Sequence, residues 1–113
     1  MNFCTGKRVY TIRMKYNKLV RDKIPAFIES KGEMVVWHKA SDVEYWEKLK
    51  EKLLEEATEF TKDESIDELA DLLEVIDAIA EYRKFSKEEV ATVKEKKLQD
   101  KGGFKERIIL DES

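Results

Sequence analysis

Apolar residues recur at helical spacing through the middle and the C-terminal half of the chain, and each such stretch follows a capping sequence. In this signature a serine Oγ accepts a hydrogen bond from the backbone N–H three residues later, where a glutamate side chain can reach back to the serine N–H. The signature occurs at Ser41–Glu44, Ser65–Glu68 and Ser86–Glu89. The pattern therefore predicts helices over about 41–61, 65–84 and 86–101.

Shorter elements are expected on both sides of these helices. Pro25 suits the first turn of a helix, so a short helix is predicted over 25–31, closed by Gly32. Short extended segments are expected near 33–37 and 104–110, where brief apolar runs stand between polar residues. Neither run is long enough to build a sheet by itself.

The fold class predicted from these elements is all-α, an antiparallel helical bundle. Four glycines and one proline provide little of the turn chemistry that an all-β fold needs. With 113 residues the chain has room for one core, so 15–113 is interpreted as a single helical domain. Residues 1–14 lack acidic groups and a clear period, and Met14 could be a start, so 1–14 is expected to be an N-terminal extension or flexible arm.

The composition excludes several classes of protein. One cysteine, Cys4, and one histidine, His38, exclude an internal disulfide framework and a zinc site built from Cys or His. No run approaches 18 apolar residues, and 1–14 is too short and too polar for a signal peptide. A cytoplasmic protein without membrane attachment is expected.

Charge is distributed unevenly along the chain. Residues 1–25 carry seven basic side chains and one acidic one, whereas 41–81 carry fifteen acidic and four basic ones. Residues 83–107 are again basic, with nine basic and five acidic side chains. A nucleic-acid partner is not expected, because such proteins are basic on one face. An acidic middle between basic flanks suits a cation held by carboxylates and a phosphate held by Lys and Arg, although solvated helix faces would also explain it.

Two pairs of carboxylates touch helix faces that must be buried. At about 100° per residue, Glu56 falls at the edge of the stripe that holds Leu49 and Leu53, with Glu59 about 60° to its other side. On the next helix Glu68 falls inside the apolar face, and Asp71 lies at the border of that face.

Buried carboxylates are costly unless something neutralises them. A cation shared by the pairs Glu56/Glu59 and Glu68/Asp71 would do so, and oxygen ligands of this kind suit Mg²⁺ or Mn²⁺. Ion pairs at the edge of the stripe, such as Glu56 with Lys52, would do so as well. Helix periodicity alone leaves both explanations open.

The ordered motifs resemble those of a known family. Glu55-Glu56-Ala57-Thr58-Glu59 followed by Glu68-Leu69-Ala70-Asp71 resembles the EExxE…ExxD signature of the MazG-like all-α nucleoside triphosphate pyrophosphatases, a superfamily that includes phosphoribosyl-ATP pyrophosphatase and dimeric dUTPase. The segments 16–25 and 97–104 look like the opening and the closing basic segment of a small single-domain branch. Only eight residues separate Glu59 from Glu68, which is shorter than the spacer usual in the superfamily.

The resemblance implies hydrolysis of a nucleoside triphosphate to the monophosphate and pyrophosphate, with removal of unwanted nucleotides (house-cleaning) as the expected role. It implies one or more Mg²⁺ ions, with Mn²⁺ as the other possibility, bound by Glu56, Glu59, Glu68 and Asp71. Glu55 or Glu59 would be the general base. The candidates for binding the phosphates are basic residues of both flanks: Lys18, Arg21, Lys23, Lys97 and Lys101. No base-binding residue is assigned.

Two alternatives remain at this point. One is a phosphoribosyl-ATP pyrophosphatase of histidine biosynthesis, which would share the metal ligands and the reaction. The other is a non-catalytic helical dimerisation module whose acidic pairs are neutralised by Lys and Arg. In either case two long helices and one weakly apolar helix make a thin core, which a second copy of the chain can complete. A homodimer or a higher homo-oligomer is therefore expected, as the resemblance also implies.

Overall fold

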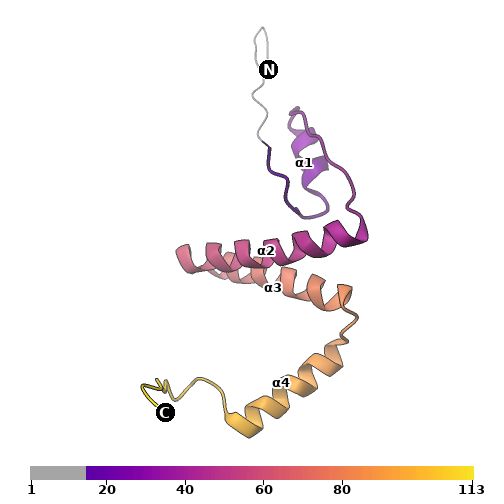
Figure 1. Cartoon of the computed structure of the whole chain (residues 1–113). Helices are drawn as coiled ribbons and strands as arrows, with labels where there is room; N and C mark the ends of the chain where they lie inside the picture. Colours follow the sequence, from indigo (N-terminus) through magenta and orange to yellow (C-terminus); the bar gives the residue numbers. More distant parts are fainter. Residues whose placement is uncertain (1–14) are drawn as a thin grey trace. The chain divides into compact units, whose positions relative to one another are not determined.

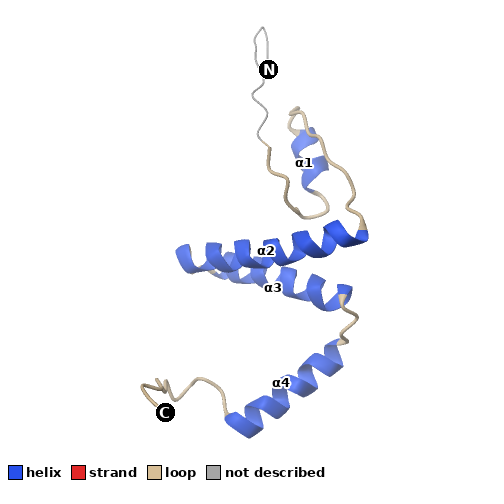
Figure 2. Cartoon of the chain, in the orientation of Figure 1, coloured by secondary structure: helices blue, strands red, loops and turns tan. Residues whose placement is uncertain are grey.

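A computed structural model describes residues 15–113, and this part of the chain contains four helices and no strand (Figures 1 and 2). The helices are α1 (Ile24–Ser30), α2 (Asp42–Lys62), α3 (Ile66–Tyr82) and α4 (Lys87–Lys101). The all-helical prediction is confirmed. The extended segments expected near 33–37 and 104–110 do not form strands: the first is irregular and the second begins with a turn. The arm proposed for 1–14 lies outside the described residues.

The structure divides into two compact units, one ending at Val75 and the other running from Ile76 to Ser113. The first unit holds α1, α2 and the first turns of α3, and it contains every acidic residue considered for a metal. The second unit holds the last turns of α3, the whole of α4 and the C-terminal tail.

All three predicted serines cap their helices, but among them only Ser86 forms a full capping box, in which the serine side chain and the glutamate side chain each accept a backbone N–H. Ser86 Oγ accepts from the Glu89 N–H at 3.0 Å, and the Glu89 carboxylate accepts from the Ser86 N–H at 2.9 Å. Ser41 caps α2 through its side chain at 3.2 Å, while the Glu44 carboxylate pairs with His38 Nε2 at 2.9 Å. The Glu44 side chain therefore bonds to His38, six residues earlier in the chain, instead of closing the capping box.

The start of α3 also departs from a full capping box. Ser65 Oγ accepts from the Glu68 N–H at 3.2 Å, but the Ser65 N–H donates to the Asp63 carbonyl at 2.7 Å. The Glu68 carboxylate is thus not needed at the cap and remains available for the face between the helices.

Helix α1 ends just before Gly32, as the sequence predicted. The Gly32 N–H donates to the Glu29 carbonyl at 2.9 Å, and Gly32 has a φ of 78°. That left-handed backbone conformation is costly for residues with a Cβ, which explains why glycine follows the last helical turn.

The buried core of the described residues is small and includes a charge. Leu49 on α2 and Val75 on α3 are 1% and 8% exposed, and Glu56 on α2 is 8% exposed. In contrast, Leu69, Leu73 and Ile76 are exposed and lie on one side of α3, at i, i+4 and i+7. α3 therefore carries apolar residues on a second face as well as on the face that meets α2. No helix within 15–113 combines the length and the apolar character required to cross a membrane.

Candidate metal centre

Three carboxylates from two neighbouring helices converge in the first unit. Glu56 comes from α2, and Glu68 and Asp71 come from the first turns of α3. One oxygen of each lies within 4.8 Å of the others. The tight turn at 63–65 folds α3 back beside α2 (Figure 1), which is why residues 12 to 15 positions apart in the sequence meet. Helix periodicity predicts Glu68 inside an apolar face and Glu56 and Asp71 at the edges of such faces, and these faces are the ones brought together.

Glu68 has the least compensated charge of the three. Its Oε2 is buried and has no hydrogen-bond partner among the described residues. Burial raises the pKa of Glu68, and the nearby charges of Asp71, Glu56, Glu59 and Asp63 raise it further. A buried carboxylate oxygen without a donor is unfavourable, and it is the kind of atom that a cation satisfies.

Glu56 is the most buried of the three, and it has a partner. Lys52, one helical turn earlier on α2, places its Nζ 3.3 Å from Glu56 Oε2 and 3.4 Å from Glu55 Oε1. The ion pair that sequence analysis offered as the alternative to a metal is therefore present. One lysine cannot neutralise the whole cluster, however, because Glu68 and Asp71 add two further negative charges beside Glu56.

Glu59 and Glu55 lie outside the group of converging oxygens. Glu59 is exposed on α2, and its side chain makes no hydrogen bond or ion pair with any described residue, yet its charge is close enough to raise the pKa of Glu68. Glu55 is held by Lys18, whose Nζ lies 2.7 Å from its Oε2. This hydrogen bond lowers the pKa of Glu55 and raises that of Lys18.

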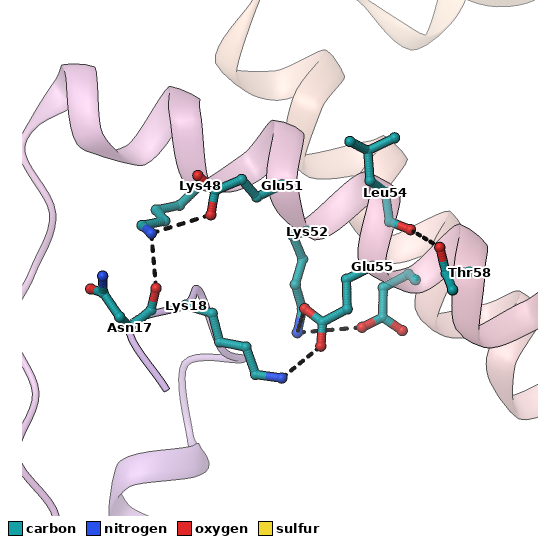
Figure 3. A network of polar contacts seen from close by, with 9 residues as sticks. Asn17, Lys18, Lys48, Glu51, Lys52, Leu54, Glu55 and Thr58 are labelled. Carbon is teal, nitrogen blue, oxygen red and sulfur yellow. Dashed lines mark hydrogen bonds and ion pairs between the residues drawn. The ribbon is translucent and has the colours of Figure 1, made fainter. Parts of the chain in front are cut away.

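The basic segment before α1, residues 15–23, lies against α2 (Figure 3). Lys48 of α2 donates to the Asn17 carbonyl at 2.8 Å, and Lys18 reaches Glu55. Further along the segment, an Arg21 guanidinium nitrogen lies 2.8 Å from Asp71 Oδ1 on α3. Two of the side chains predicted to bind phosphate are thus ion-paired at the acidic site.

The remaining predicted phosphate ligands are placed elsewhere. Lys23 is exposed at the residue before α1. Lys97 and Lys101 are exposed on α4, which belongs to the second unit. Their predicted role stays a prediction.

Sequence reasoning missed the pairing of Arg21 with Asp71 and of Lys18 with Glu55. These partners are 50 and 37 positions apart, so no spacing rule connects them. The sequence signal that was present is the contrast between the basic residues 1–25 and the acidic residues 41–81. It indicates that these segments attract each other, but it does not show which side chains pair.

The donor set fits a hard divalent cation. It consists of carboxylate oxygens only, which suit Mg²⁺ or Mn²⁺, and Glu68 Oε2 is a buried oxygen that lacks a donor. Comparison of the chain with models of protein families, with curated proteins and with solved structures gave no match.

Proposed function

We propose that this protein is a metal-dependent nucleoside triphosphate pyrophosphohydrolase that converts a nucleoside triphosphate and water to the monophosphate and pyrophosphate. The observation that carries the proposal is the convergence of Glu56, Glu68 and Asp71 around a buried carboxylate oxygen without a donor. The resemblance of the surrounding sequence to the MazG-like pyrophosphatases supports the same reaction. A cytoplasmic setting, where nucleoside triphosphates are made and used, belongs to the proposal.

In this proposal Glu56, Glu68 and Asp71 hold Mg²⁺, or Mn²⁺ in its place. A bound divalent ion neutralises phosphate oxygens and lowers the pKa of a coordinated water. Glu59 is the better of the two candidates for general base, because its carboxylate has no partner among the described residues. Glu55 is less suited, because its ion pairs with Lys18 and Lys52 favour the charged form and weaken it as a proton acceptor.

The basic segment supplies the cations that a leaving pyrophosphate needs. Arg21 is the strongest candidate, since a guanidinium can bind phosphate through two parallel hydrogen bonds. It is already within contact distance of Asp71 in the acidic cluster. Lys18, which contacts Glu55, is the second candidate.

The test is pyrophosphate release from a panel of nucleoside triphosphates, including deoxy and damaged bases, with and without Mg²⁺. Glu68→Gln should abolish metal-dependent release, because it removes the buried charge that the cation satisfies. Glu74→Gln is the matched control, since Glu74 is an exposed glutamate on the same helix. Orthophosphate as the first product would indicate cleavage at the γ-phosphate and would overturn the proposal. Release from phosphoribosyl-ATP alone would identify the narrower enzyme of histidine biosynthesis.

A non-catalytic helical module is the second candidate, and two ion pairs favour it. Lys52 with Glu56 and Arg21 with Asp71 neutralise part of the cluster without any metal. In that case Mg²⁺ would leave the melting temperature unchanged, whereas a ligand that binds only the folded state must raise it.

We further propose that the chain functions as a homodimer. The exposed apolar side of α3 supports this, because Leu69, Leu73 and Ile76 would otherwise remain in water. Pairing of two such faces would complete a helical bundle that one copy leaves thin.

A further inference from the structure

One carboxylate of the acidic cluster is already held by a cation that belongs to the chain. The Arg21 guanidinium lies 2.8 Å from Asp71 Oδ1, and Asp71 is one of the three residues whose oxygens converge. A guanidinium and a divalent ion attract the same negative charge. Arg21 therefore competes with any metal that binds this cluster.

The contact belongs to the basic segment 15–23, in which Arg21 is the one described side chain that forms an ion pair with the triad Glu56, Glu68 and Asp71. Lys48 holds the Asn17 carbonyl, and Lys18 holds Glu55 (Figure 3). These two contacts do not involve Glu56, Glu68 or Asp71. The segment can consequently stay docked through Asn17 and Lys18 while Arg21 changes its partner.

We propose that Arg21 is an internal counterion of Asp71 that a divalent metal displaces, so that metal loading releases the guanidinium to bind phosphate. This inference rests on the metal site of the proposed function. It adds a regulatory step: the metal-free site is held by the protein's own cation, and metal and phosphate favour each other's binding. Metal takes over Asp71, and phosphate then takes over Arg21.

The exposure of the pair makes the exchange feasible. The Arg21 and Asp71 side chains are 55% and 40% exposed. Ion pairs this exposed are worth up to about 1 kcal/mol, which corresponds to a factor of about five in an equilibrium constant. Arg21 should thus weaken metal binding measurably without preventing it. Because coupling between two ligands is reciprocal, a phosphate that captures the released guanidinium should strengthen metal binding.

Calorimetric titration with MgCl₂ alone tests the competition. Arg21→Gln should bind Mg²⁺ about two- to fivefold more tightly than the wild type. Lys23→Gln is the matched control: it removes the same charge two residues further along the segment, from a side chain without an ion pair among the described residues. Its Mg²⁺ affinity should change less than that of Arg21→Gln.

Nitrogen-15 NMR of the Arg21 guanidinium tests the displacement directly. The Asp71→Asn variant, which cannot form the charged pair, defines the released signal without metal. In the wild type, saturating Mg²⁺ should move the Arg21 signal to that position.

The outcomes separate the two proposals. Mg²⁺ binding with an unchanged affinity in Arg21→Gln, or with an unmoved Arg21 signal, would overturn the displacement and leave the metal site standing. Failure of both the wild type and Arg21→Gln to bind Mg²⁺ would overturn the metal site and the displacement together. Binding by Arg21→Gln but not by the wild type would also overturn the displacement, because Mg²⁺ would then fail to release Arg21, and it would leave the metal site standing.

Discussion

Arg21 and Asp71 are 50 positions apart in the chain, and their side chains meet at 2.8 Å. The contact joins the basic opening of the chain to the acidic helices, and it does so at a residue of the converging triad. The first unit therefore brings its opposite charges together at the place where the candidate metal ligands gather.

Removal of the Glu68 charge should have opposite effects with and without metal. Without metal, Glu68→Gln should melt at a higher temperature than the wild type, because a half-buried carboxylate beside other carboxylates is replaced by a neutral amide. With Mg²⁺, only the wild type should gain thermal stability. Melting curves followed by circular dichroism test both statements, and a wild type that Mg²⁺ does not stabilise would contradict the second.

The advantage of Glu68→Gln without metal should depend on pH. Because the folded state raises the pKa of Glu68 above its ordinary value of 4.5, the protonated form is favoured in the folded protein. The contribution of Glu68 to stability is present at low pH and is lost as the pH rises through the raised pKa. The difference in melting temperature between the variant and the wild type should accordingly be small near about pH 4 and should grow toward neutral pH. A difference that is constant over this range would contradict the account.

The ion pair between Lys18 and Glu55 should show the opposite pH dependence. The folded state lowers the pKa of Glu55, so the stabilising effect is present above 4.5 and is lost as the pH falls through the lowered value. Both side chains are partly exposed, which limits the coupling to about 1 kcal/mol or less. A double-mutant cycle of Lys18→Gln and Glu55→Gln, measured by urea unfolding at neutral and acidic pH, tests the size and the trend. A coupling that increases on acidification would exclude the charged pair as its source.

Two leucines on α2 should differ strongly in their response to truncation. Leu49 is 1% exposed, so Leu49→Ala should cost about 2–5 kcal/mol of unfolding free energy. Leu54→Ala is the matched control, because Leu54 is 70% exposed and its loss should stay within about 0.5 kcal/mol. Urea unfolding of the two variants measures both values, and equal costs would mean that Leu49 is not the centre of the core.

A charge on the exposed side of α3 should disrupt the proposed homodimer. Leu73 is 52% exposed, and Leu73→Glu would bury an unpaired carboxylate in an apolar interface. Sedimentation velocity should show dissociation of the dimer, with the dimer dissociation constant raised about tenfold or more. Thr58→Glu adds the same charge to an exposed position of α2 and should leave the dimer intact. A dimer that is unaffected by both substitutions must use another surface.

Local sequence signals determined much of the helical structure. The three capping serines marked the starts of α2, α3 and α4 to within a residue, because a cap depends only on neighbouring backbone atoms. The end of α3 came two residues before the predicted Lys84, which has a positive φ of 62°. Helix periodicity also placed Glu68 inside an apolar face and Glu56 and Asp71 at the edges of such faces, since the phase of a residue around a helix is set by its position alone.

The tertiary structure decided which of the predicted site residues contact one another. Glu59 and Glu56 are three residues apart, yet only the carboxylate of Glu56 joins Glu68 and Asp71. The partners of Lys18 and Arg21 depend on how the opening segment docks on α2 and α3. The sequence by itself determined where helices begin and which faces carry acid, because both are local properties of the backbone. The choice of partners came from the tertiary structure, because side-chain contacts between distant residues depend on the packing of whole elements and on no spacing in the chain.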